Sequence, residues 1–284
     1  MKKLLVIAAL IGLFASASHA DFKLWQLSAH NHTIQMCGYV IQTEHGKIIM
    51  VDGGFYPDGE AVRDFVNERG GVVEAWFLTH YHNDHTGALS TILTDGKGPK
   101  INRVYIHPLD YDKVNIYEND RMIRILNDQF KEHNIFPLTL VAGTVFYIDG
   151  VKIEVLRVYN PDIHENFGNN AGSVFRISDS KRSVLFLGDL GVEGGRELLA
   201  KYGNKLKSDY VQMAHHGQNG VEKDVYEAIN PKVCLWPTPK WLWDNNRGKG
   251  YNTGPWKTVE VRGWMDELGV KTHYVSMDGI QEIK

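Results

Sequence analysis

The sequence predicts an α/β protein in which two β-sheets are covered by helices. Strand-like and helix-like segments alternate along the chain, and hairpin signals occur both near the start and in the middle. A hydrophobic content of 43% is ordinary for a chain with a full-sized core. The chain shows no internal repeat or low-complexity linker, so we expect residues 21–284 to form one large domain.

Residues 1–20 predict a secretory signal peptide. Two lysines follow the initial methionine, and the apolar run after them is too short to span a bilayer comfortably. Ser18-His19-Ala20 has the form of a small-residue cleavage site, so cleavage is expected after Ala20. A retained membrane anchor is the alternative. The first interpretation predicts a secreted or periplasmic protein with no stable membrane insertion.

The net charge of the chain argues against polyanionic partners, which would be held by long-range electrostatic attraction. The formal net charge is −3 at pH 7, and loss of the two leader lysines would make it −5. A surface of this kind does not attract nucleic acid or anionic membranes. We therefore expect a small-molecule or phosphoester substrate, and nucleic acid is a partner that the charge does not favour.

The two cysteines, Cys37 and Cys234, leave two interpretations open. They could pair in an oxidising compartment, or they could be separate buried thiols. A chain of this length does not need a disulfide framework, and nothing in the sequence places the two residues together.

Strands dominate the first half of the chain. The β-rich runs lie at residues 34–42, 47–51, 74–79 and 101–106. His45-Gly46 predicts a hairpin between the first two runs. Residues 60–69 place apolar side chains on one helical face and stop at two glycines, and residues 122–133 predict a second helix.

Strands and helices alternate more regularly in the second half. The strand-like runs lie at residues 139–148, 152–159, 173–177, 183–187 and 272–276, with shorter ones around Val211 and Val233. Asp149-Gly150 predicts a hairpin between the first two. Helical patterns lie at residues 193–202, 221–229 and 256–268.

The most informative segment is a string of metal-binding side chains directly after a strand. His80, His82, Asp84 and His85 follow the apolar run at 74–79. Neutral imidazoles and carboxylates are suitable ligands for zinc and similar ions, and loops at strand ends are where a rigid scaffold holds catalytic groups. A chance polar loop is the alternative, but the full His-x-His-x-Asp-His string is more specific than that.

This string, together with three segments elsewhere, resembles the pattern of the metallo-β-lactamase superfamily. Asp52, followed by two glycines, resembles the end of an early family strand, and Asp189, preceded by a glycine, resembles the end of a later one. His215-His216 before a glycine resembles the segment that carries the last ligand histidine. The resemblance spans residues 24–240. It implies a four-layer αββα sandwich of two mixed β-sheets flanked by helices.

The resemblance also implies roles for the first four ligand residues. His80 and His82 would hold a first metal ion. Asp84 and His85 would hold a second ion and are the expected catalytic residues, with Asp84 also steering the nucleophile.

The more distant residues would complete this arrangement. Asp189 would bridge the two ions, and one or both of His215 and His216 would complete the second site. His215 is favoured because it directly follows a strand. Asp52 would accept a hydrogen bond that orients a ligand histidine, and capping a turn is its alternative role.

The sequence departs from the family pattern at one ligand position. Many members carry Gly-His-Thr-x-Gly-Ser before the Gly-Asp strand, and that histidine is the third ligand of the first metal. Here the segment reads Gly-Asn-Asn-Ala-Gly-Ser, with Asn169 in the place of the histidine. An amide oxygen is a poorer zinc ligand than imidazole, so the resemblance implies a weaker or more open first site. His164 is an alternative donor.

The branch of the superfamily sets the expected activity. The Asn-Asn and His-His-Gly forms resemble the branch that contains the hydrolase domain of DNA-uptake competence proteins and some secreted phosphodiesterases. Dedicated β-lactamases usually have another residue in the place of His85. The resemblance implies a metal-dependent hydrolase of phosphodiesters or phosphate esters. The alternatives are a lactone, ester or lactam hydrolase, and a non-catalytic binding protein with a decayed metal site.

The implied cofactors are two divalent metal ions. Zinc is the default for a histidine-rich site, and manganese or iron are alternatives. Two ions about 3.5–4 Å apart can share a water and lower its pKa, so hydroxide would be the nucleophile. Because metal binding requires neutral imidazoles, activity should fall in acid.

Residues 236–256, which we call the tryptophan-rich segment, follow the His-His-Gly motif. Their aromatic side chains could form a substrate-binding lip over the metals by stacking or cation–π attraction. The alternative is that they pack against the last helix of the chain. The sequence leaves both interpretations open.

Overall fold

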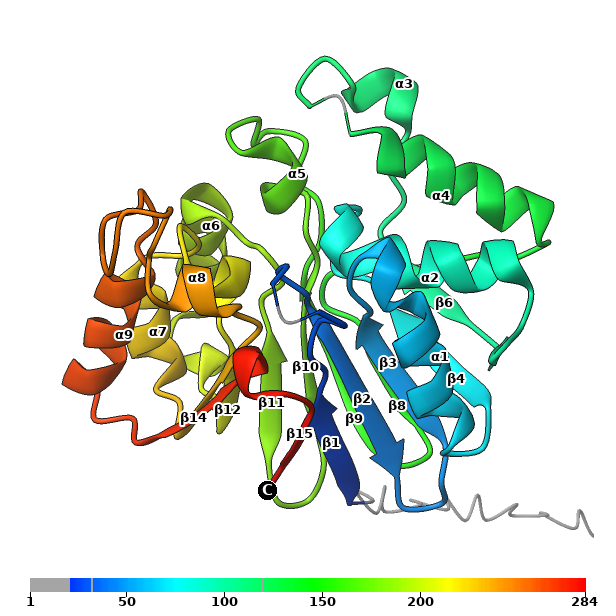
Figure 1. Ribbon diagram of the computed structural model, residues 1–284, viewed down its shortest axis with the longest axis horizontal. Coiled ribbons are helices and arrows are strands. Elements are labelled where there is room, and N and C mark those ends of the chain that lie inside the picture. The colour runs from blue at the N-terminus through cyan, green and yellow to red at the C-terminus, as the bar shows by residue number, and fades with distance from the viewer. Residues whose placement is uncertain (1–20, 32, 119) are drawn as a thin grey trace, which may run out of the picture.

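Two stacked β-sheets form the centre of the molecule (Figure 1). The computed structural model describes residues 21–31, 33–118 and 120–284, so the signal peptide predicted at 1–20 lies outside the described residues. The first sheet runs in the order β15 (Gln281–Ile283), β1 (Phe22–Gln26), β2 (Gly38–Thr43), β3 (Ile48–Asp52), β4 (Val72–Phe77), β6 (Val104–Ile106) and β7 (Leu138–Thr139), and β5 (Lys100–Ile101) pairs with β4.

The second sheet has a parallel half and an antiparallel half. Its order is β14 (Thr272–Val275), β13 (Val233–Trp236), β12 (Tyr210–Gln212), β11 (Ser183–Phe186), β10 (Val174–Ser178), β9 (Val151–Arg157) and β8 (Val145–Ile148). The pairs from β11 to β14 are parallel, and those from β8 to β11 are antiparallel. The first sheet is also mixed, since β3 pairs with β2 in antiparallel fashion and with β4 in parallel.

Helices cover the outer face of each sheet (Figure 1). The first sheet is covered by α1 (Gly59–Asn67), α2 (Asn83–Asp95) and α4 (Arg121–Glu132), with the short α3 (Tyr111–Val114) beyond α4. The second is covered by α6 (Val192–Tyr202), α7 (Lys223–Ile229), α8 (Lys240–Trp243) and α9 (Thr258–Glu267), while α5 (Phe167–Asn170) lies at the upper edge in this view. This arrangement confirms the predicted αββα sandwich.

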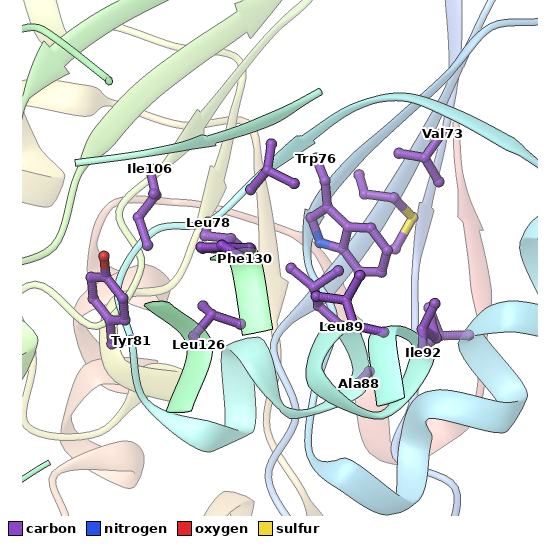
Figure 2. Close-up of a cluster of buried hydrophobic side chains, with 14 of the residues drawn as sticks. Val73, Trp76, Leu78, Tyr81, Ala88, Leu89, Ile92, Ile106, Leu126 and Phe130 are labelled. Carbon is purple, nitrogen blue, oxygen red and sulfur yellow. The ribbon is translucent and has the colours of Figure 1, made fainter. Parts of the chain in front are cut away.

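Three apolar layers hold the sandwich together. The layer between the sheets contains aromatic side chains such as Phe77 and Phe175, whose rings lie 5.3 Å apart. Outside the first sheet, Trp76 is fully buried among side chains that include Leu89 of α2 (Figure 2). A third layer packs α6, α7 and α9 on the second sheet. Complete burial of one large apolar side chain contributes about 1.5–3 kcal/mol, so these layers fix the positions of the strand ends.

The helices follow from local sequence signals. In α1, Val62 and Val66 are buried on the face that the pattern predicted. In α4, the Asp120 side chain accepts a hydrogen bond from the Met122 backbone N–H at 2.8 Å and so caps the helix.

Several predicted boundaries differ from the structure. The single strand expected at 139–148 is two strands, because the chain turns at Gly143, where φ is 89°, and crosses from β7 in one sheet to β8 in the other. The run at 34–42 becomes regular only at Gly38, and 101–106 divides into β5 and β6. Strand β1 was not predicted; it pairs with β2 on one side and with β15, at the far end of the described chain, on the other.

Cys37 and Cys234 are separate buried thiols. They lie in different apolar layers, with Cys37 between the sheets and Cys234 beneath the helices of the second sheet. In the part of the chain that the structure describes, no helix combines the length and apolarity needed to cross a bilayer.

Candidate metal centre

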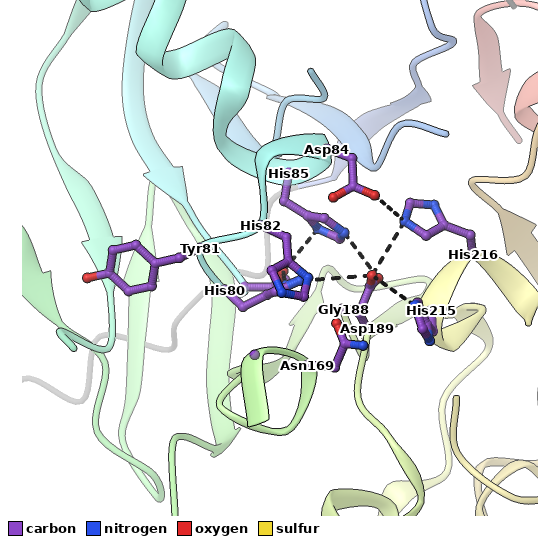
Figure 3. A network of polar contacts seen from close by, with 12 residues as sticks. His80, Tyr81, His82, Asp84, His85, Asn169, Gly188, Asp189, His215 and His216 are labelled. Atoms are coloured by element: carbon purple, nitrogen blue, oxygen red, sulfur yellow. Dashed lines mark hydrogen bonds and ion pairs between the residues drawn. The ribbon is translucent and has the colours of Figure 1, made fainter. Parts of the chain in front are cut away.

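The predicted metal-binding side chains meet where strands β4, β11 and β12 end (Figure 3). The loop after β4 carries His80 and His82, and the first turn of α2 carries Asp84 and His85. In the second sheet, Asp189 follows β11, and the two histidines at 215 and 216 follow β12. Residues more than a hundred positions apart therefore share one site, because strands β4, β11 and β12 end at the same edge of the sandwich.

The ligand-capable atoms of the described residues form three groups: one contains Cys37, Asp52 and His85, and the other two share Asp189. Within each group, one candidate atom from every residue lies within 4.8 Å of the others. Of the two that share Asp189, the first group consists of His80, His82 and Asp189, and the second group consists of Asp84, His85, Asp189 and His216.

Asp189 is placed as a bridging carboxylate would be. Its Oδ1 lies 3.1 Å from His85 Nε2, and its Oδ2 lies 3.5 Å from His216 Nε2 and 3.9 Å from His80 Nε2. The side chain is almost fully buried, so ionisation requires compensating positive charge nearby. Both oxygens face imidazoles from different segments, which is the geometry that the resemblance implied.

Buried polar atoms without partners show that the site suits cations. In the described residues, Nε2 of His80, His85 and His216 and Oδ1 of Asp189 are buried and make no hydrogen bond. Unsatisfied buried polar atoms cost about 1–3 kcal/mol each. Four such atoms aimed at one another fit the nitrogen and oxygen ligand set of divalent metal ions.

Thr79 and Asp52 determine which ring nitrogens face the centre. The Thr79 hydroxyl donates to Asp52 Oδ2 at 2.8 Å, so it accepts from His80 Nδ1, 3.0 Å away. Asp52 Oδ2 lies 2.8 Å from His85 Nδ1. An ionised carboxylate has no proton to donate, so His85 Nδ1–H is the donor of this hydrogen bond. In both histidines Nε2 is therefore the ring nitrogen that faces the centre. The same carboxylate accepts from the Thr79 backbone N–H, so Asp52 both orients a histidine and holds the strand end.

The two adjacent histidines occupy different environments. His216 is fully buried, its Nδ1 donates to the Pro237 carbonyl at 2.7 Å, and its Nε2 lies 3.1 Å from Asp84 Oδ2. The side chain of His215 is 20% exposed, and its Nε2 lies 3.8 Å from Asp189 Oδ2. The geometry thus places His216 in the second group, whereas the sequence favoured His215. Both residues adopt left-handed backbone, with φ of 50° and 55°, and this turns the second imidazole inward.

Asn169, the residue that stands at the departing ligand position of the sequence, lies in α5. Its Nδ2 donates to Asn166 Oδ1 at 2.9 Å, while its Oδ1 is buried without a hydrogen-bond partner in the described residues. Figure 3 shows the side chain beside Asp189. His164 does not join the site: it is exposed, and its Nε2 contacts the Pro161 carbonyl at 2.9 Å.

The charges of the site are strongly coupled. Burial and the neighbouring histidines hold the pKa of His80 well below its ordinary value, which keeps its lone pair available. Burial opposes ionisation of Asp84, but hydrogen bonding to His216 and the charge of His85 hold the pKa of Asp84 well below its usual range. The site therefore presents ionised carboxylates to a bound cation.

Two polar residues at the site were missed by the sequence analysis. Gln35 donates from Nε2 to Asp84 Oδ2 at 2.7 Å. Glu118 lies with Oε1 3.0 Å from His82 Nε2. Neither belongs to a recognisable motif, so only the fold reveals them.

The tryptophan-rich segment divides into two parts. Trp243 lies against Trp236 at 5.2 Å and beneath the Arg262 guanidinium of α9, which matches the packing interpretation. Trp241 instead donates to the Thr33 carbonyl at 2.7 Å, and that carbonyl is two residues from Gln35, which contacts Asp84. The substrate-binding lip stays a prediction for this second part.

Comparison with known proteins agrees with the fold and the motifs. The family model described as "Metallo-beta-lactamase superfamily" matches residues 38–232. The chain therefore belongs to the metallo-β-lactamase superfamily.

The similar curated proteins include, by their names, a recombination protein and a competence protein. Recombination protein 2 of Haemophilus influenzae is 23% identical over 204 residues, which cover 70% of this chain and 22% of that protein. Competence protein ComA of Neisseria gonorrhoeae is 35% identical over 89 residues, covering 31% of this chain and 12% of that protein. These matches confirm the predicted branch, although the chain spans less than a quarter of each relative.

Similar solved structures show the same fold. The metallo-beta-lactamase fold protein YhfI from Bacillus subtilis has a TM-score of 0.57 at 14% identity, covering 93% of this chain and 100% of that one. CmlA from Streptomyces venezuelae, a diiron β-hydroxylase, also has a TM-score of 0.57 at 12% identity, covering 93% of this chain and 54% of its own.

Metal uptake is expected to release a proton from His216. Burial alone would lower the pKa of His216, but Asp189 and Asp84 raise it to about 10 in the metal-free protein. At pH 7.5 the ring is then protonated, and a cation that takes the Nε2 lone pair must displace that proton. Metal affinity should therefore rise as the pH increases toward 10.

Calorimetry in buffers of different ionisation enthalpy measures this release. Wild-type protein should release more protons per chain than His216→Ala. Equal proton release by the two proteins would contradict the assignment.

Proposed function

We propose that this protein is a secreted, two-metal hydrolase of phosphodiesters or phosphate esters. The observation that carries the proposal is the pair of buried ligand groups that share Asp189. A two-metal site of this kind would suit phosphoryl transfer, because bound ions would activate a water and stabilise negative charge on the substrate oxygens. The names of the curated relatives, which refer to recombination and competence, also favour phosphodiester chemistry.

Each candidate ligand residue would have a defined role in the two-metal site. His80 and His82 would hold the first ion, Asp84, His85 and His216 the second, and Asp189 would bridge them. The bound ions would supply an activated water and neutralise charge on the substrate. Zinc is the ion that this donor set favours, with manganese or iron as alternatives.

Asp84 is suited to orient the attacking group. Its Oδ2 is held between Gln35 Nε2 and His216 Nε2, at 2.7 and 3.1 Å. A carboxylate fixed on two sides can accept a hydrogen bond from a reacting water in one direction only. His215 keeps partial access to solvent, and burial lowers its pKa, so its neutral imidazole could contact substrate or accept a proton from a reacting water.

The predicted signal peptide supports the proposed location. Its two lysines, apolar run and small-residue end belong to residues 1–20. Sequencing the amino terminus of protein recovered outside the cytoplasm should find residue 21 first.

A chelator-sensitive assay on three substrate classes tests the activity. We expect turnover of a chromogenic bis-aryl phosphodiester, its loss after removal of metal by a chelator, and its recovery with Zn²⁺ or Mn²⁺. Turnover restricted to lactone or lactam substrates would replace the phosphoester proposal by the second class of hydrolysis. Absence of both bound metal and turnover would identify a decayed site.

A further inference from the structure

Glu118 contacts the candidate metal site from a separate part of the fold. It lies between α3 and α4, in the helical lobe beyond the first sheet (Figure 1). Its Oε1 is 3.0 Å from His82 Nε2, and its Oε2 accepts a hydrogen bond from the Gly168 backbone N–H at 2.5 Å. One carboxylate thus joins the first metal motif to the short helix α5, which carries Asn169.

His82 is oriented in the opposite sense to the other histidines of the two groups. His80, His85 and His216 each engage an acceptor through Nδ1 and leave Nε2 toward the centre. In His82 it is Nε2 that meets an acceptor, the Glu118 carboxylate. An ionised carboxylate only accepts, so the proton belongs on Nε2 and the lone pair on Nδ1.

Gly168 makes this contact sterically feasible. A β-carbon at position 168 would overlap both His82 Nε2 and Glu118 Oε2. Any side chain there would push the carboxylate away from the imidazole. The glycine that precedes Asn169 is therefore required by close approach and not by backbone conformation.

The missing family histidine increases the importance of this contact. With Asn169 in that place, the first group contains only two imidazoles, His80 and His82. An imidazole that rotates freely loses conformational entropy when it binds a metal ion, and this loss weakens binding. An imidazole that is already held in one orientation avoids most of that loss. The orientation of His82 should then decide much of the affinity of the first site.

We propose that Glu118 is a positioning residue that holds His82 with Nδ1 directed at the first metal ion. The inference rests on the proposed two-metal site. It makes the lobe of α3 and α4 part of the metal site, although that lobe supplies no ligand of its own. Outer partners of ligand histidines typically change metal affinity by about 10–100-fold.

Metal competition against a chromogenic chelator tests the proposal without an activity readout. Glu118→Ala should weaken the first of two Zn²⁺ ions by about 10–100-fold and still bind two at saturation. Glu118→Gln keeps one acceptor oxygen, so it should lie between wild type and Glu118→Ala. Glu132, an exposed carboxylate at the end of α4, gives the matched control Glu132→Ala, which should bind both ions normally.

A double-mutant cycle adds a second measurement. Gly168→Ala should weaken the same ion, and the Glu118→Ala, Gly168→Ala double variant should be no weaker than Gly168→Ala, because both changes break one contact. Thermal unfolding of the metal-free proteins reports any general damage to the fold. Additive losses in metal affinity would overturn the proposal.

Other outcomes are equally decisive. Unchanged affinity in Glu118→Ala would also overturn the proposal, and so would failure of that variant to bind the first ion at saturation, which would make Glu118 a ligand. Wild-type protein that binds no pair of ions refutes the proposed function itself. Wild-type protein with two ions, combined with an unaffected Glu118→Ala, refutes only the positioning role.

Discussion

Asp189→Asn should abolish most of the hydrolytic activity. The substitution preserves shape but removes the one charge that both ligand groups share, with its oxygens 3.1 Å from His85 Nε2 and 3.5 Å from His216 Nε2. Metal ions contribute several kcal/mol of transition-state stabilisation, and about 1.4 kcal/mol corresponds to a tenfold change in rate. We expect kcat/KM to fall by roughly 10³-fold or more, with weaker binding of both ions, measured by metal analysis and steady-state kinetics.

Asp179→Asn is the matched control. Asp179 is another buried aspartate of the second sheet, but it accepts backbone N–H groups of the turn between β10 and β11, away from the metal site. Its replacement should lower the unfolding temperature and leave metal content and turnover unchanged. If Asp189→Asn behaves in the same way as this control, the bridging role is wrong.

His216→Ala and His215→Ala should separate a metal ligand from a residue that faces the substrate. His216→Ala removes the buried imidazole whose Nε2 approaches both Asp84 and Asp189, so an ion of the second group should be lost together with roughly 10³-fold in turnover. His215→Ala should retain two ions and lose on the order of 10²-fold in kcat, as expected of a general base.

The two variants are well matched because both positions have left-handed backbone, so alanine imposes a similar local cost at each. The number of metal ions per chain is the deciding measurement. Loss of an ion in His215→Ala, with two ions retained in His216→Ala, would restore the ligand order that the sequence favoured.

Elements with strong local patterns could be predicted from the sequence, and those that depend on distant pairing could not. Helix α1 and the hairpin of β2 and β3 follow from apolar periodicity and turn residues within a few positions. Strand β15 pairs with β1, so the partner of this last strand lies more than two hundred residues earlier in the chain. The crossing from β7 to β8 depends on one glycine turn inside an otherwise strand-like run.

The residues of the candidate site show the same difference between local and distant sequence signals. The string from His80 to His85 is contiguous, and the family resemblance directed attention to Asp189. The choice between His215 and His216 is set by two consecutive left-handed residues, and their sequence alone does not show which ring turns inward. Glu118 reaches the site through the path of a whole helical lobe, which no local pattern encodes.

The division of the candidate ligands between the two sheets has a consequence for the lifetime of the protein. His80, His82, Asp84 and His85 belong to one half of the sandwich, while Asp189 and His216 belong to the other. Bound ions would link the two halves of the sandwich to each other. At a free ion concentration of about 100 times Kd, this binding would add about 2.7 kcal/mol to the free energy of unfolding. When metal is scarce, the two halves would separate locally more often, and the loops of the site would become accessible to proteases.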